Sequence, residues 1–163
     1  MHTPLDNIRQ EWKGLQQIRF RLEKDYERWD RLVELAKDTF ARLHNEIGWD
    51  DDFEVNDTLP KTRELRLILR HIFPLDEELL GYANDAILSF EQRLSGQLFI
   101  WYFFPQKEHF TQQNKPQAIA AGQYRIDQFL QDEHLLLFQV ETFLNELKGW
   151  VLEVLPEPVE EKA

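Results

Sequence analysis

Hydrophobic residues recur along this chain at alternating steps of three and four positions, which is the spacing of a helix that packs along one side. The first run extends from Leu5 to Ile47 without an internal proline, and Gly48 follows where a helix would end. At about 1.5 Å per residue, a single helix over this run would be about 65 Å long. Only Arg19 interrupts its apolar stripe.

Two further runs keep the same spacing. The second covers residues 60–104 and contains Pro74, which either kinks one helix or separates two. The third covers residues 116–154, and Glu133 is the one charged residue on its stripe. We expect the middle run to be interrupted at Pro74, so that the three runs form four helical pieces.

An apolar stripe on one helix must be buried against another element, so three stripes in one chain predict a mutual bundle. The sequence therefore predicts an all-α fold, an elongated antiparallel bundle of three long helices with coiled-coil-like packing. Residues 1–155 would form this single domain. Residues 156–163 are rich in proline and acidic residues, which predicts a disordered tail.

In this bundle the first and third runs would be parallel neighbours, and their charged stripe residues would lie at similar heights. Arg19 and Glu133 are then expected to form a buried ion pair, which would specify the register more than it stabilises the fold. The alternative is that Arg19 extends outward to water while Glu133 lies at the rim of the bundle.

From Leu98 to Phe104 every side of the predicted helix is apolar, and a helix of this kind is surrounded by other groups. This segment either fills the core of the protein or forms a patch that another subunit or a partner covers. The candidate interaction residues are Phe99, Trp101, Tyr102, Phe103 and Phe104.

Composition narrows the possible compartments and partners. The chain of 163 residues has no cysteine and a formal net charge of -11, which excludes disulfides and thiolate chemistry and disfavours broad attraction to nucleic acid. Its longest apolar run is far shorter than the roughly 20 residues that span a membrane. The N-terminus lacks the pattern of a secretory signal. We therefore expect a cytoplasmic protein without membrane contact.

Candidate chemistry is sparse. No histidine follows a glutamate by three positions, as a di-metal helical bundle requires, and the acidic segment at Asp50 lacks the glycine and glutamate of a calcium loop. We predict no metal and no cofactor. Arg63, Arg66 and Arg70 would form a basic ridge on a helix, where they could hold phosphate or an acidic partner. Alternatively, this ridge pairs with the neighbouring acidic residues.

Arg66 and His71 form an R-x4-H pattern, followed by Ile72 and Phe73. This pattern resembles the active motif of the HEPN superfamily, whose all-helical domains include ribonucleases. The resemblance implies that His71 and Arg66 would activate a ribose hydroxyl and stabilise the cleaved phosphate. It covers about eight residues, and Leu67 stands where a polar residue commonly follows the arginine in that family.

Taken together, these patterns predict a non-enzymatic helical protein that acts through protein–protein contact, as an adaptor, an assembly factor or a subunit of a complex. Its partner would be another protein or a second copy, bound through the aromatic patch. The alternative is a HEPN-like protein that binds or cleaves RNA through Arg66 and His71, with nucleic-acid contact limited to the basic ridge. A membrane-bending bundle is disfavoured by the net charge.

Overall fold

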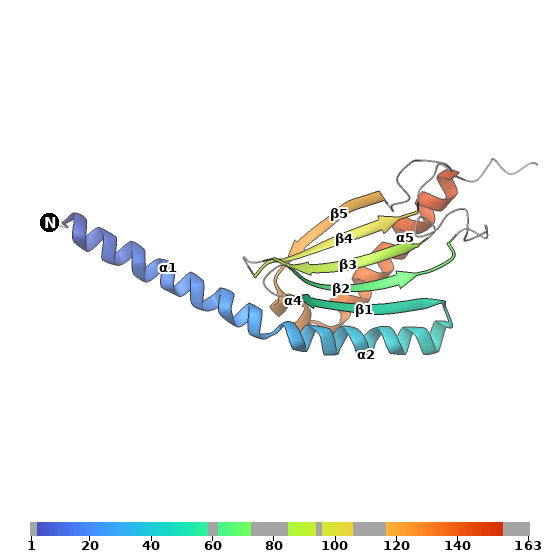
Figure 1. Ribbon diagram of the computed structural model, residues 1–163, viewed down its shortest axis with the longest axis horizontal. Coiled ribbons are helices and arrows are strands. Elements are labelled where there is room, and N and C mark those ends of the chain that lie inside the picture. Colours follow the sequence, from blue (N-terminus) through green and yellow to red (C-terminus); the bar gives the residue numbers. More distant parts are fainter. Residues whose placement is uncertain (1–2, 59–61, 73–84, 94–95, 106–116, 155–163) are drawn as a thin grey trace, which may run out of the picture.

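The protein has a mixed α/β fold, which overturns the prediction of an all-α bundle. The computed structural model describes residues 3–58, 62–72, 85–93, 96–105 and 117–154. In these ranges a long bent N-terminal helix leads into a five-stranded antiparallel sheet, and a C-terminal helix follows the sheet (Figure 1). The chain is therefore neither a helical bundle nor an intramolecular coiled coil.

The first predicted helical run is helical, but it is not one straight rod. It consists of α1 (Pro4–Glu27) and α2 (Trp29–Ile47), and the bend between them lies at Arg28. Gly48 ends α2 as predicted, with a φ of +74° that favours glycine, and its N–H donates to the carbonyl of His44 at 2.8 Å. In Figure 1, α2 runs along the sheet beside β1, whereas α1 extends away from the sheet.

The described part of the second predicted helical run forms strands, whereas the third begins as a strand and continues as helix from Ile126, as predicted. Each strand is antiparallel to the next, and the spatial order follows the chain order. Two helices follow the last strand, α4 (Ile126–Gln131) and α5 (Glu133–Val154). The strands are β1 (Asp51–Thr58), β2 (Thr62–Leu69), β3 (Ala86–Gln92), β4 (Leu98–Phe104) and β5 (Gln117–Tyr124).

Local sequence explains why these segments are strands. In β2 the buried residues Leu65, Leu67 and Leu69 alternate with Glu64 and Arg66, and this period of two places the leucines on one face. A run of only seven residues rich in aromatic side chains, such as β4, fits a strand better than a helix. Pro74 lies outside the described residues, as does the predicted tail at 156–163.

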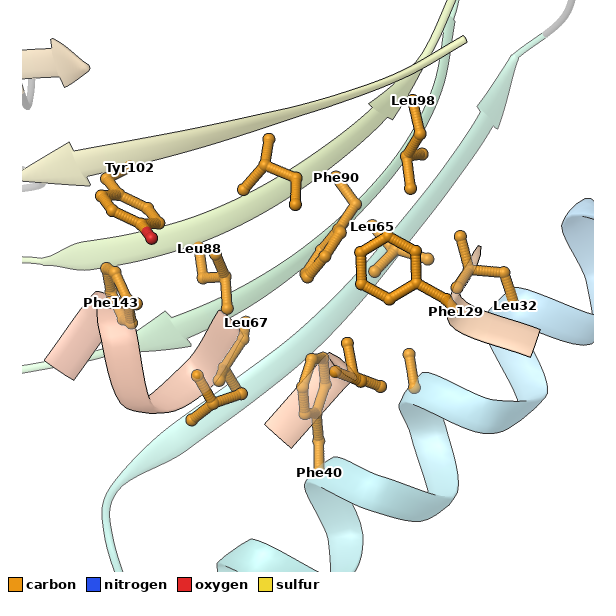
Figure 2. Close-up of a cluster of buried hydrophobic side chains, with 14 of the residues drawn as sticks. Leu32, Phe40, Leu65, Leu67, Leu88, Phe90, Leu98, Tyr102, Phe129 and Phe143 are labelled. Carbon is orange, nitrogen blue, oxygen red and sulfur yellow. The ribbon is translucent and has the colours of Figure 1, made fainter. Parts of the chain in front are cut away.

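The core lies between one face of the sheet and the helices α2, α4 and α5. Figure 2 shows Phe40 of α2, Phe129 of α4 and Phe143 of α5 directed toward the inner side chains of the strands, such as Leu67 and Phe90. These side chains are at most 1% exposed. The face of the sheet that carries them is called the inner face below, and the opposite face is called the outer face.

Candidate functional site

Among the residues that the structure describes, α1 carries a continuous row of exposed apolar side chains. The side chains of Leu5, Ile8, Trp12, Leu15 and Ile18 are each at least half exposed, although they recur at steps of three and four along one side of the helix. Figure 1 shows why, because α1 extends into solvent beyond the edge of the sheet. We call these five residues the α1 seam. An amphipathic helix whose apolar side faces water is typical of a contact surface for another molecule.

The N-terminal end of α1 begins with a complete capping box. The hydroxyl of Thr3 accepts from the backbone N–H of Asp6 at 3.2 Å, and the Asp6 carboxylate accepts from the backbone N–H of Thr3 at 3.2 Å. Pro4 occupies the first helical position, where its missing N–H leaves no hydrogen bond unmade. These local features support the helix at the end that lies farthest from the sheet.

The C-terminal end of α1 is held firmly to the sheet. Asp25 is 2% exposed, and its carboxylate accepts from the guanidinium of Arg125 at 3.2 and 3.4 Å. The side-chain amide of Gln92 donates to the Asp25 carbonyl at 3.2 Å, and the hydroxyl of Tyr26 donates to the Arg93 carbonyl at 2.8 Å. Contacts from two separate parts of the chain, Arg125 and the segment Gln92–Arg93, therefore determine the direction in which α1 leaves the body.

The bend between α1 and α2 carries a second set of ionic contacts. Arg28, at the bend, pairs with Asp127 at the start of α4, and Arg125 also reaches Asp127 at 3.5 Å. Trp29, immediately after the bend, is 1% exposed. Sequence reasoning missed this cluster, because its partners lie about a hundred positions apart. Asp25 sits next to the apolar stripe of the first run, but that position alone does not identify its partner.

The predicted aromatic patch is divided between the two faces of β4. Tyr102 and Phe104 lie on the inner face, where the Tyr102 ring packs 5.4 Å from the Phe143 ring. Phe99, Trp101 and Phe103 lie on the outer face and are partly exposed. The prediction treated all five as one surface, but successive side chains of a strand point to opposite faces. Only the three outer residues can contact another molecule.

The outer residues form a stripe flanked by paired charges. The Arg93 guanidinium lies 4.1 Å from the Phe99 ring centre, and Arg66 lies 5.7 Å from that of Phe103. Arg66 also pairs with Glu64, and Arg93 with Glu91, in each case two residues earlier in the chain. Beside Phe99 and Trp101 lies an open hollow of about 530 Å³, partly lined by residues 120–123 of β5. This stripe is a second, smaller candidate contact surface.

Replacing Tyr102 with phenylalanine is expected to reduce the loss of stability at alkaline pH. Burial, with smaller contributions from Glu146 and Tyr124, raises the pKa of the Tyr102 phenol from its ordinary value to about 12. The unfolded chain releases this proton near pH 10, so wild-type stability falls as the pH rises from about 10 to about 12. Between pH 8 and pH 11 the wild type should lose about 1 kcal/mol more than Tyr102→Phe. Urea unfolding at both pH values measures the difference, and an equal loss in the two proteins would contradict it.

The predicted basic ridge does not form, because β2 is a strand rather than a helix. Arg66 and Arg70 lie on the outer face, whereas Arg63 lies on the inner side and donates to the Tyr26 carbonyl. Arg70 pairs with Asp52 and, at 3.3 Å, with Asp85, and the hydrogen bond from Asp52 contributes most to the raised pKa of Arg70. The alternative interpretation, pairing with acidic side chains, describes Arg70.

The R-x4-H pattern is likewise not brought together as a site. Arg66 lies within β2 and pairs with Glu64, while His71 lies beyond the end of the strand, 3.7 Å from the Asp50 carboxylate. Five residues along a strand span about 16 Å, too far for two side chains to act on one phosphate. The HEPN resemblance also implied an all-helical domain, which this protein is not.

Arg19 and Glu133 do not form the predicted buried pair. Arg19 is exposed on α1 and pairs with Glu23 at 3.4 Å, one turn along the same helix. Glu133 is exposed in the first turn of α5. The prediction assumed that the first and third runs are parallel rods, but α1 leaves the body and residues 117–124 form β5. The alternative, in which Arg19 extends to water, describes its position.

The acidic segment after α2 is part of β1, with Asp52 and Glu54 in the strand. Within the described ranges, no three histidine, aspartate or glutamate side chains are placed to share a metal ion. None of the helices in the described part of the chain is both long and apolar enough to cross a membrane.

Comparison of the chain with protein-family models, with curated proteins and with solved structures found no match. The α1 seam and the outer stripe on β4 are therefore defined by their own chemistry alone.

Proposed function

We propose that this protein is a non-enzymatic interaction protein that acts through protein–protein contact, with the α1 seam as its main contact surface. The observation that carries the proposal is the exposure of Leu5, Ile8, Trp12, Leu15 and Ile18 on a helix that extends beyond the sheet. Exposure of these large apolar side chains to water raises the free energy of the protein. Covering them with another surface lowers it.

Two features support this proposal over an accidental exposure. The base of α1 is held by the buried Asp25, by Gln92 and by Tyr26, so the seam is presented in a defined direction. Tryptophan is also enriched among the residues that dominate binding energy at protein interfaces, and Trp12 lies at the middle of the seam. The outer stripe of Phe99, Trp101 and Phe103 would serve as a second contact surface.

The proposal places the protein in the cytoplasm. The chain contains no cysteine, so its fold uses no disulfide and does not depend on an oxidising compartment.

A photo-crosslinking amino acid at position 12 tests the proposal in cells that naturally make the protein. We expect a covalent adduct from position 12, because a benzoylphenylalanine there keeps the apolar aromatic character of Trp12. The matched control is the same amino acid at Gln17, which is exposed and lies about 140° around the helix from Trp12. An adduct at position 12 but not at position 17 supports the seam as the contact surface. No adduct at position 12, or equal adducts at both, would overturn the proposal.

A further inference from the structure

The two edges of the sheet differ in how they are protected from other strands. β1, at one edge, runs beside α2 and carries four acidic residues, Asp51, Asp52, Glu54 and Asp57 (Figure 1). β5, at the other edge, has no charged residue over Gln117–Tyr124. Charged side chains and covering helices are common means by which proteins prevent a sheet edge from pairing with another chain. The sequence of β5 contains no such charge.

The open side of β5 offers backbone groups to an added strand. Each residue of a strand carries one N–H and one C=O, and at an edge every second residue directs both groups away from the sheet. Among the described residues, β4 is the only segment whose backbone is hydrogen-bonded to β5. An extended segment of another chain would therefore pair with the outward groups, antiparallel like every neighbouring pair of this sheet.

The outer face beside this edge has room for the side chains of an added strand. Trp101 lies opposite Ala120, and Phe103 lies opposite Ala118, so short side chains of β5 stand beside large rings of β4. The hollow of about 530 Å³ extends over both strands. Neighbouring strands are about 4.8 Å apart, so the side chains of an added strand start about 10 Å from those of β4. A large side chain there meets the Trp101 ring above Ala120.

An irregularity in β5 determines where the added strand pairs. The register between β4 and β5 shifts between Ile100 and Trp101, which makes Ala121 an extra residue in β5. A bulge of this kind bends the strand and interrupts its ladder of hydrogen bonds. The regular part of the edge is therefore residues 117–120, and beyond it an added segment passes over the hollow toward Arg93.

The lining of the hollow indicates the chemistry of the added segment. Arg93 is the one charged residue among those that line it, and its hydrogen bond to Glu91 at 2.9 Å uses only Nε of the guanidinium. Its terminal nitrogens can donate to a carboxylate of the added segment. A second copy does not fit, because its own β5 presents Ala118, Ala120 and Gln123 on the outer face. None of these side chains is acidic or both large and apolar.

We infer that β5 accepts an extended segment of another protein as an additional, antiparallel strand. This segment carries an acidic residue beside Arg93, then a large apolar residue in the hollow, then residues that pair with positions 117–120. Main-chain hydrogen bonds supply affinity in this mode of binding, and the side chains in the hollow supply specificity. The inference deepens the proposed function and rests on the part of it that assigns contact to the outer stripe.

Selection from a phage-displayed library of random peptides on the immobilised full chain tests the inference. We expect the enriched peptides to share an acidic residue followed by a large apolar residue. Ala120→Lys should raise their dissociation constants at least ~10-fold, because it places a charge at the edge beside Trp101. Ala41→Lys, at an exposed position on α2, is the matched control and should change them less than ~2-fold. Both variants should keep the thermal unfolding midpoint.

Two results of this selection would overturn the inference. One is that no peptide is enriched on the wild type relative to Ala120→Lys. The other is that the enriched peptides bind the two proteins equally.

N-methylation of an enriched peptide distinguishes strand addition from other modes of binding. A methyl group on a backbone nitrogen removes its donor, and only every second residue of an added strand donates to its neighbour. We expect single methylations to weaken binding at least ~10-fold at alternate residues of the paired stretch, and less than ~3-fold at the residues between them. Effects that do not alternate would contradict pairing with the β5 edge.

The adduct at position 12 tests the proposed function separately. An adduct there, with no enriched peptide, would overturn strand addition and leave the α1 seam as a contact surface. Enriched peptides that behave as expected, with no adduct at position 12, would support strand addition and overturn the α1 seam as the main contact surface.

Discussion

Replacing Phe129 with alanine is expected to lower the free energy of unfolding by about 3–5 kcal/mol. Phe129 is 0% exposed, and its ring packs edge-on against two others, with ring centres 5.8 Å from Phe90 and 5.4 Å from Tyr124. Like Ile126, it is a fully buried apolar side chain of α4, and Figure 2 shows it between Leu32 of α2 and Phe90 of the sheet. The substitution removes the buried ring and its packing contacts, and it leaves a cavity that the neighbouring helices cannot fully close.

Urea unfolding at neutral pH measures this effect, and Phe138→Ala is its matched control. Phe138 lies on α5 but is 56% exposed, so the same change there should alter the free energy of unfolding by no more than about 0.5 kcal/mol. An equal decrease in the free energy of unfolding at the two positions would contradict the packing of Phe129 in the core.

Replacing Asp25 with asparagine is expected to lower the free energy of unfolding by about 2 kcal/mol. Removing one partner of a fully buried ion pair typically costs about 3–5 kcal/mol, because the other charge remains without compensation. Asp25 is buried, but the Arg125 side chain is partly exposed and also reaches Asp127, so water and a second carboxylate reduce the effect. The substitution keeps the shape of the side chain, removes its charge and replaces one of the two oxygens that accept from Arg125 with an NH2 donor.

The control for this prediction is Asp38→Asn, an exposed position on α2. We expect it to change the free energy of unfolding by less than about 0.5 kcal/mol. Hydrogen exchange adds a local measurement, because loss of the Arg125 contact should speed exchange of the amides around the bend at Arg28. Slow exchange there in Asp25→Asn, with unchanged stability, would show that the other contacts hold α1 without the carboxylate.

These two substitutions act on different parts of the same arrangement. Phe129 stabilises the body, whereas Asp25 also determines how α1 leaves it. If the direction of α1 matters for contact, Asp25→Asn should weaken association more than Phe129→Ala does when both proteins are folded.

The helical part of the prediction succeeded where the pattern is local. Residues 5–47 contain good helix formers, a continuous apolar stripe and a glycine stop, and each of these signals acts within a few residues. The bend at Arg28 was not predictable, because it depends on Asp127 and Arg125, which are distant in sequence.

The strands were mistaken for helices because short apolar runs fit both periods. In β2 the alternation of leucine with charged residues was visible, and in β4 the aromatic enrichment over seven residues favoured a strand. The seven-residue spacing of apolar residues nevertheless predicts helix over both segments. The candidate sites depended on the predicted helices. Arg63 and Arg66 would lie on the same side of a helix, but on a strand they point to opposite faces. The same holds for Trp101 and Tyr102.

The sequence by itself determined the extent of the N-terminal helical segment and the presence of an apolar stripe along it, because the preference for helix and the spacing of side chains on it are local properties. Only the tertiary structure decided which part of that stripe is buried. From Trp29 to Leu43 the stripe packs into the core beneath the sheet, and before Leu22 it faces solvent. That division depends on long-range contacts at the bend, which place α2 beside β1 and direct α1 away from it.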